Sequence, residues 1–486
     1  MRLARSRLLQ LRTFLFILGF LVYPASNKIC GQTLTARIVV SSVPPARVVV
    51  EARGPETDTW SFRNIYAGIG NLGARVENFK VHADGQSITV RNLAPGEFRS
   101  SKEVSKFSYE IVLVERSRAA ELSHVSWINR ERGFLMLADL LPRFGREALT
   151  PSKLSLNFQL PAGWSVASAP LPDSDRQYSV ADIDNAVFYV GRELRETSKL
   201  VDSMEVGLIT SGDWPFSDDD ALKIAARIVQ EHSKLTQYRL KKRAVVFLAP
   251  LSGPEGPDRW TAETRGASVV LLMGRNAGQK ALLGRLGVVL AHELFHLWVP
   301  NALALKGEYD WFFEGFTLYQ ALLTSVRLNL IKFDEYLNTM ARVYDSYRSL
   351  PDHDKLSLIE ASERRWTAAP SFVYDKGMLV AFIHDLKLRQ NRRTETTADI
   401  YPELFRTEVT PSRDANEVIM SVLNRSPGMS QFFEDYVQNG GDIPLDAILA
   451  QYGLRVETKD FRTRILIKKD LSAEQRLLLR SLGYRG

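Results

Sequence analysis

The sequence predicts an α+β protein with more than one domain, in which an all-β N-terminal part precedes a mixed and then mainly helical part. From Thr33 to residue 214, short runs rich in Val, Ile, Phe and Tyr are separated by Gly, Pro and Asn, as is typical of a β-sandwich. From residue 217, a Ser-Asp-Asp-Asp cap precedes apolar residues at helical spacing. With 486 residues, 45% of them hydrophobic, the chain is long enough for two or three domains.

The domain boundaries are predicted where this character changes along the chain. We expect a β domain at 33–214, a mixed central domain at 215–350, a helical C-terminal domain at 351–464 and a short tail at 465–486. The central domain should contain the two segments that carry the candidate site described below.

The first 32 residues have the pattern of an export signal. Basic residues from Arg2 to Arg12 precede an apolar run at 14–23. This run is short for a membrane span, which needs about 20 residues. We therefore expect cleavage between Ser26 and Thr33 and an exported protein, periplasmic or secreted. If the segment is not cleaved, it would anchor the protein in a membrane and would be its only membrane contact.

The net charge does not indicate a nucleic-acid-binding protein. The formal charge is +7, but five basic residues and no acidic ones lie in the proposed signal, so the remainder carries +2. We therefore expect no nucleic-acid partner. Cys30 is the only cysteine, and it lies in the same segment, so no disulfide is expected.

The segment A-H-E-L-F-H-L-W at 291–298 places two histidines and a glutamate in an apolar run, which we expect to be one helix from Ala281 to Trp298. Burying such groups without partners costs several kcal/mol. On a helix His292 and His296 lie one turn apart on one face, as zinc ligands do, and Glu293 is placed to act as a general base on a metal-bound water. The alternative interpretation is two structural histidines in the core.

A third zinc ligand is expected, because catalytic zinc usually has three protein ligands and an open position. Glu314 is the one carboxylate in the apolar segment 311–319, beyond a loop that lets this second helix fold back against the first. Glu308 and Asp310 are nearer in sequence but lie in the polar loop. We expect these two to accept a hydrogen bond from a histidine N–H, if they contribute at all.

H-E-L-F-H-L-W at 292–298, followed by W-F-F-E-G-F-T-L-Y at 311–319, resembles the gluzincin zinc metallopeptidases. Within them the two segments are most similar to the glycyl aminopeptidase family. The resemblance implies a thermolysin-like catalytic domain between the β domain and the helical C-terminal part. It also implies one zinc ion on the two histidines and Glu314, with Glu293 as catalytic base and a peptide or protein as substrate.

The same resemblance assigns roles to residues outside the zinc motif. Tyr374, in F-V-Y-D-K-G, matches a tyrosine that donates a hydrogen bond to the oxyanion. Family members grip a peptide's free amine with the glutamate of a Gly-Gly-x-Glu-His-like segment; here T-A-E-T-R-G-A-S at 261–268 retains only Glu263. We expect the strand that begins at Ser268 to pair with an extended substrate. No C-terminal PDZ domain, common in the family, is expected after 452–456.

We therefore expect hydrolysis of peptide bonds by a metal-activated water, whether as an aminopeptidase or an endopeptidase. The alternative is an exported zinc-containing peptide-binding protein without peptidase activity. Glu293 argues against this alternative, because a purely structural zinc needs no general base. His82 and His124 of the β domain are isolated histidines, and we expect both to be structural or surface residues.

Overall fold

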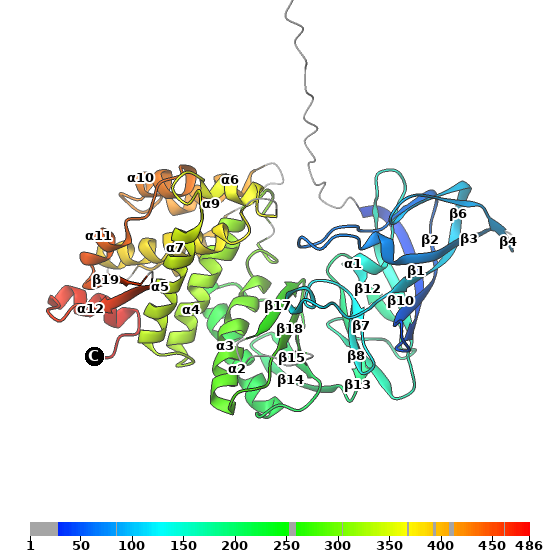
Figure 1. Ribbon diagram of the computed structural model, residues 1–486, viewed down its shortest axis with the longest axis horizontal. Coiled ribbons are helices and arrows are strands. Elements are labelled where there is room, and N and C mark those ends of the chain that lie inside the picture. Colours follow the sequence, from blue (N-terminus) through cyan, green and yellow to red (C-terminus); the bar gives the residue numbers. More distant parts are fainter. Residues whose placement is uncertain are drawn as a thin grey trace, which may run out of the picture.

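A computed structural model shows a β-rich part joined to a helical part, with the central domain between them (Figure 1). It describes all residues except 1–27, Asp84, 252–258, Ala304, 367–368, 392–394, 408–412 and Phe461. The proposed export signal therefore falls outside the described residues up to residue 27. In the described part of the chain, no helix has the length and apolar composition needed to cross a membrane.

A nine-stranded sheet forms the outer layer of the β-rich part. Its main strand order is β12-β10-β1-β2-β6-β3-β4, with β5 paired to β6 and β9 paired to β2. The strands are β1 (Lys28–Ser41), β2 (Arg47–Ser61), β3 (Val76–Ala83), β4 (Gln86–Ile88), β5 (Val90–Ala94), β6 (Glu97–Val112), β9 (Arg143–Phe144), β10 (Thr150–Gln159) and β12 (Tyr178–Val180). The strands predicted in this region from short runs rich in Val, Ile, Phe and Tyr are confirmed.

A four-stranded sheet packs beneath the first, in the order β11 (Trp164–Ser168), β13 (Val187–Arg192), β8 (Arg132–Met136) and β7 (Trp127–Ile128). Successive side chains of a strand point to opposite faces of its sheet. Phe188 and Val190 of β13 join the core under the nine-stranded sheet, whereas Val187 and Tyr189 join a second core on the other side. Both faces of the small sheet are therefore buried.

A five-stranded sheet closes this second core, in the order β14 (Arg195–Val201), β15 (Met204–Thr210), β16 (Ala244–Pro250), β18 (Ser268–Met273) and β17 (Trp260–Arg265). β15 runs parallel to β16, so β14 and β15 belong to the sheet of the central domain rather than to the sandwich. The boundary predicted at residue 214 is misplaced for this reason. The sequence of an apolar strand such as β15 does not show whether it belongs to the sandwich or to the sheet of the central domain.

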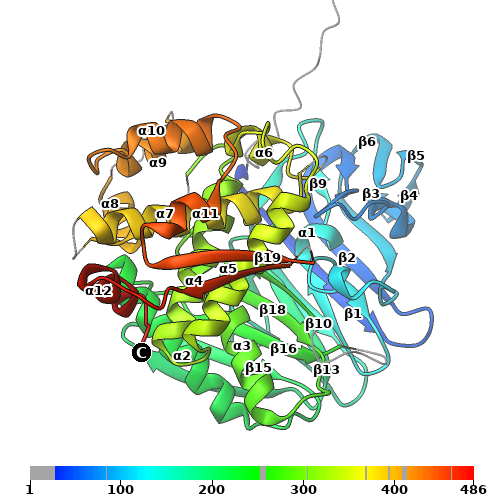
Figure 2. The ribbon, with the colours of Figure 1, turned by 60° about the vertical axis from the view of Figure 1, so that its left-hand side comes forward.

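On the other face of the five-stranded sheet lie helices that share one core with it, α2 and α3 against the strands and the others beyond them (Figure 2). They are α2 (Asp218–Thr236), α3 (Gln279–Glu293), α4 (Thr317–Arg327), α5 (Phe333–Ser349), α6 (Leu358–Glu363) and α7 (Phe372–Asn391), with a 3-10 turn η3 (Phe295–Leu297) and a π-helical turn η4 (Trp311–Phe316). The single helix expected from Ala281 to Trp298 is thus interrupted after Glu293. Pro300, which has no N–H to donate, follows the 3-10 turn closely.

The C-terminal part adds α8 (Ile400–Arg406), α9 (Ala415–Leu423), α10 (Ser430–Phe433), η6 (Glu434–Gln438), α11 (Leu445–Ala450), the hairpin β19 (Leu454–Lys459) and β20 (Arg462–Ile467), and α12 (Ala473–Ser481). The Thr463 N–H donates to the Asp345 carboxylate of α5, 3.0 Å away. Leu479 of α12 is fully buried in the main core. The predicted tail at 465–486 is therefore packed structure, and its predicted start falls inside β20.

Candidate active site

Helix α3 carries the first part of the site and is held against its neighbours by apolar packing. Leu286, Leu290 and Ala291 are fully buried, as its nearly uniform apolar sequence predicts. From α2, His232 Nε2–H donates to the Ala291 carbonyl oxygen at 2.9 Å. Burial lowers the pKa of His232 to about 3, so this histidine is neutral and has a structural role. Its contact fixes the backbone immediately before His292.

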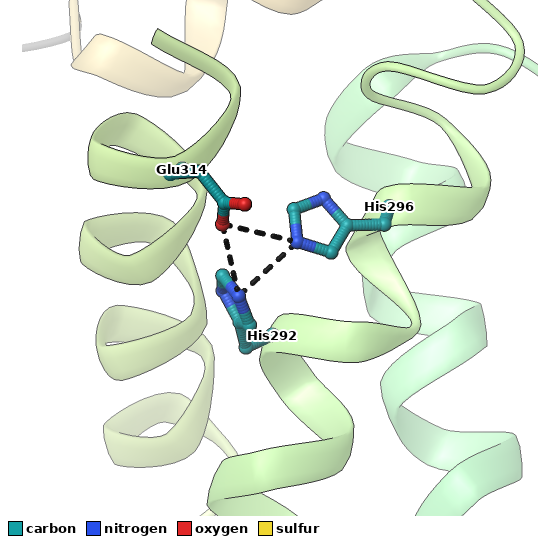
Figure 3. Close-up of side chains that lie close together, drawn as sticks. All are labelled: His292, His296 and Glu314. Atoms are coloured by element: carbon teal, nitrogen blue, oxygen red, sulfur yellow. Dashed lines mark hydrogen bonds and ion pairs between the residues drawn. The ribbon is translucent and has the colours of Figure 1, made fainter. Parts of the chain in front are cut away.

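Three side chains converge at the end of α3, as Figure 3 shows. His292 Nε2 and His296 Nε2 lie 3.1 Å apart. Glu314 Oε2, from η4, lies 3.4 Å from each of them. Four ligands placed tetrahedrally at zinc–nitrogen distances of about 2.0–2.1 Å are separated by about 3.3 Å. The spacing of the three atoms is therefore that of zinc ligands.

The surrounding hydrogen bonds leave the atoms that point into the cluster free to bind a metal. His296 Nδ1–H donates to the Val299 carbonyl oxygen at 2.9 Å, which leaves Nε2 unprotonated for a metal. Glu314 Oε2 is buried and has no hydrogen-bond partner among the described residues. Buried polar atoms are normally satisfied. These residues thus fit a single zinc ion.

Glu314 and His296 also shift each other's pKa. Burial lowers the pKa of His296, but the nearby Glu314 carboxylate outweighs this effect and raises it. Burial raises the pKa of Glu314, yet His296, His292 and Arg365 together hold it well below its ordinary value. Glu314 is therefore ionised, as a metal ligand must be.

Glu293 lies next to the metal-binding cluster and is 5% exposed. Its carboxylate oxygen Oε2 accepts a hydrogen bond from Thr264 Oγ1 of β17 at 2.7 Å, and its main-chain oxygen lies 2.8 Å from the same hydroxyl. The edge strand β17 therefore orients this side chain. The motif places Glu293 beside the histidines, but nothing in the sequence indicated Thr264.

Tyr374, at the start of α7, also reaches the cluster. Its hydroxyl donates to Glu314 Oε1 at 3.1 Å, so the phenol lies beside the third candidate ligand. Burial is the main cause that raises the pKa of Tyr374 well above its ordinary value, and the Glu314 charge adds to it. The phenol therefore remains a proton donor at neutral pH.

Arg365 is a site residue that the sequence analysis missed. Its guanidinium contacts the carboxylates of Asp310 and Glu314 and the hydroxyl of Tyr374. Asp310 was expected to accept from a histidine N–H, but its carboxylate binds Arg365 instead, while Glu308 is exposed. The segment E-R-R-W shows no motif, so only the folded chain reveals this contact.

Glu263 on β17 is enclosed by residues of both parts of the molecule. It accepts a hydrogen bond from the Tyr66 hydroxyl, its Oε2 lies 2.8 Å from His124 Nδ1, and the same oxygen lies 3.2 Å from Arg265 Nε. Burial raises the pKa of Glu263, but Arg265 and His124 outweigh this effect and hold it below its ordinary value. The isolated His124 is thus a structural residue that joins the β-rich part to β17.

The expectation for Ser268 requires a correction. Its strand, β18, is hydrogen-bonded to β16 on one side and to β17 on the other, and Ser268 is 2% exposed. β18 therefore has no free edge for a substrate. The edge of this sheet is β17, the strand that carries Thr264 and Glu263. A strand's position within a sheet cannot be read from its own sequence.

Residues 285–380, which include all of the metal-binding cluster and Tyr374, match the sequence profile of the M61 glycyl aminopeptidase family. The chain is a zinc metallopeptidase. Its cofactor is one zinc ion. No curated protein sequence matches this metallopeptidase. The match confirms the resemblance inferred from the two sequence segments.

Solved structures share the fold of the metallopeptidase over most of its length. An aminopeptidase N family protein from Idiomarina loihiensis has a TM-score of 0.74 at 18% identity, covering 88% of this chain and 79% of that one. An M1 zinc metallopeptidase from Deinococcus radiodurans has a TM-score of 0.53 at 14% identity, covering 85% and 94%. A mutant of the Deinococcus enzyme bound to a Tyr-Ser-Ala substrate gives 0.52 at 13%, again covering 85% and 94%. The multidomain α+β architecture is thus that of the M1 enzymes.

Proposed function

We propose that the metallopeptidase binds its zinc ion through His292, His296 and Glu314, and that Glu293 is the catalytic base. When bound, zinc acts as a Lewis acid that polarises the scissile carbonyl and lowers the pKa of water. Glu293 accepts a proton from the attacking water and delivers it to the leaving amine. The Tyr374 hydroxyl donates to the oxygen on which negative charge develops.

The observation that carries this proposal is the convergence of Glu314 Oε2 on both histidine Nε2 atoms, with Glu293 adjacent in sequence and held by Thr264. A structural zinc site would need no such base. The test is Glu293→Gln, which keeps the shape of the side chain but removes its basicity. We expect normal zinc content and loss of peptide hydrolysis.

The matched control is Glu417→Gln, an exposed glutamate on α9, which should leave hydrolysis unchanged. Both proteins are assayed by mass spectrometry of a digested peptide library, with and without a chelator. A Glu293→Gln protein that cleaves peptides at the wild-type rate would falsify the role of the base.

We propose aminopeptidase activity as the first candidate for substrate class, on the basis of the family match at residues 285–380. Glu263 is the candidate group for the substrate's α-amine. One observation favours internal cleavage as a second candidate: Glu263 is already engaged by Tyr66, His124 and Arg265, and the Arg265 guanidinium would repel an ammonium group.

Matched peptides with free and N-acetylated termini separate the two candidates. An aminopeptidase cleaves only the free peptides, and Glu263→Gln then raises the KM for them. An endopeptidase cleaves both members of each pair at similar rates, and Glu263→Gln then affects both equally. The proposed export of the protein rests on the N-terminal sequence alone, and cell fractionation with N-terminal sequencing of the mature protein tests it.

A further inference from the structure

Arg365 occupies a buried position at the edge of the metal-binding cluster. It lies two residues beyond the end of α6 and is 7% exposed, which is unusual for an arginine. Its guanidinium carbon lies 4.5 Å from the ring centre of Trp366, 5.0 Å from that of Tyr374 and 5.7 Å from that of Phe313. Aromatic faces attract a guanidinium and restrict its motion. The side chain is therefore held in one place.

The two ends of the guanidinium fork contact different groups. Nη1 contacts the Asp310 carboxylate, and Nη2 contacts both Glu314 Oε1, at 2.8 Å, and the Tyr374 hydroxyl. Asp310 directly precedes η4, Glu314 lies within it, and Tyr374 lies on α7. Arg365 thus ties together the two segments that supply the third candidate ligand and the candidate oxyanion donor.

These contacts give the two oxygens of Glu314 different environments. Oε1 accepts hydrogen bonds from Arg365 and Tyr374, whereas Oε2 has no hydrogen-bond partner within the part of the chain that the structure describes and lies 3.4 Å from each histidine Nε2. We propose that Arg365 is a positioning residue of the metal centre, which holds Oε1 so that Oε2 faces the zinc position between His292 and His296.

Charge and geometry both favour arginine in this role. Asp310 and Glu314 are buried carboxylates, and a cation between them offsets their mutual repulsion. Arginine presents a rigid planar fork that reaches two acceptors at once, whereas lysine presents one flexible point charge. A lysine at this position would retain the charge but could not contact Asp310, Glu314 and Tyr374 all at once.

Arg365 also sets the direction of the Tyr374 hydroxyl. The phenolic oxygen accepts a hydrogen bond from Nη2, so its own proton is directed toward an acceptor on the metal side, here Glu314 Oε1. This part of the inference rests on the proposed function. The effect on zinc affinity rests only on the zinc ligands of that proposal and not on its catalytic steps, because metal binding can be measured without turnover.

The experiment compares Arg365→Met and Arg365→Lys with Arg364→Met, in which the exposed neighbouring arginine is removed. Zinc affinity is measured on the metal-free full-length proteins by competition with a chromogenic chelator, and folding by circular dichroism. Loss of a residue that orients a metal ligand typically lowers affinity about 10- to 100-fold. We expect this loss in Arg365→Met, a smaller loss in Arg365→Lys and none in Arg364→Met.

At saturating zinc, we also expect Arg365→Met to lower kcat at least about tenfold with little change in KM, because Tyr374 loses its orientation. A folded Arg365→Met protein with zinc affinity within about twofold of wild type overturns the inference. If Arg365→Met does not fold, Arg365→Lys decides: wild-type zinc affinity and kcat in that variant overturn it equally. Turnover by Glu293→Gln would instead overturn the proposed function and leave the affinity result standing.

Discussion

Gly315 and Gly377 lie backbone to backbone where η4 crosses α7. A Cβ built on Gly315 would lie 2.5 Å from the Gly377 Cα, and one built on Gly377 would lie 2.5 Å from the Trp311 carbonyl oxygen. Only glycine allows this approach at both positions. Each glycine is close in sequence to a functional side chain, Gly315 to Glu314 and Gly377 to Tyr374. The close crossing therefore explains why the two side chains meet.

Substituting Gly377 with alanine should separate η4 from α7. The added methyl group meets backbone atoms that cannot rotate away, so we expect a loss of about 1–3 kcal/mol in the free energy of unfolding. We also expect hydrolysis to fall at least about tenfold, because Tyr374 moves away from the metal centre. Urea unfolding and a peptide assay measure both effects. Gly284→Ala is the control: its Cβ would be 3.5 Å from its nearest neighbour, so this variant should be active and at least as stable as wild type.

Replacing Thr264 with valine should slow the reaction without affecting the metal. Valine has nearly the same shape but cannot donate the hydrogen bond to Glu293 Oε2. Hydrogen bonds to charged groups contribute about 1.5–3 kcal/mol, so we expect kcat to fall about tenfold or more. Zinc content should be unchanged. Thr264→Ser retains a hydroxyl and should recover most of the rate; a Thr264→Val enzyme as fast as wild type would show that the contact is incidental.

Tyr374→Phe should lower kcat and preserve the fold. Removing one donor to a developing oxyanion typically costs about 10²- to 10³-fold in kcat. We expect KM to change little, because the interaction forms mainly in the transition state. Steady-state kinetics on one peptide give both values. Tyr238→Phe, which alters an exposed tyrosine, is the control, and equal rates for the two variants would exclude Tyr374 from the chemistry.

Removing zinc should destabilise the protein as well as inactivate it. A ligand that binds only the folded state contributes about 4 kcal/mol when its concentration is 1,000 times its Kd. We expect the midpoint of thermal unfolding to fall on chelation and to recover when zinc is added back. His296→Ala should show no such zinc-dependent shift. A shift that persists in this variant would mean that the stabilising ion binds elsewhere.

Lys376 should make stability depend on pH above neutrality. Its side chain is fully buried, and burial lowers its pKa to about 8, an effect that Asp442 and Asp354 only partly offset. Its pKa in the unfolded chain is about 10.4, so between these values the unfolded state binds more protons and stability rises with pH. Lys376→Met should lack this rise between pH 8 and about 10 and be more stable by about 1–3 kcal/mol at pH 7. Lys355→Met, at an exposed lysine, should follow the wild type in urea unfolding across this range.

The residues of the metal centre were predictable because they lie in two short sequence segments. Helical spacing alone places His292, Glu293 and His296 together, and one carboxylate in an apolar helix start identifies Glu314. Arg365 was not predictable, since its carboxylate partners Asp310 and Glu314 lie 55 and 51 positions away in the sequence. Its sequence neighbourhood resembles any exposed turn.

The strands were predictable, but their neighbours were not. Alternation and β-branched residues identify β13 and β15 as strands, yet do not say which sheet each one joins. Because β15 pairs with β16, residues 204–210 belong to the sheet of the central domain. Because β18 lies between two strands, it cannot pair with a substrate as expected for the strand of Ser268. Such pairings depend on contacts between distant parts of the chain.

One face of the four-stranded sheet of β7, β8, β11 and β13 can be buried only late in synthesis of the chain. The strands of this sheet leave the ribosome before β16 and β18, whose side chains cover the face formed by Phe134, Met136 and Tyr189. Until then, that apolar face lacks the side chains of β16 and β18 and is exposed to water or to a chaperone. The nascent β-rich part is therefore prone to aggregation during this interval of synthesis. A chain that terminates near residue 240 should aggregate rather than yield a separate domain.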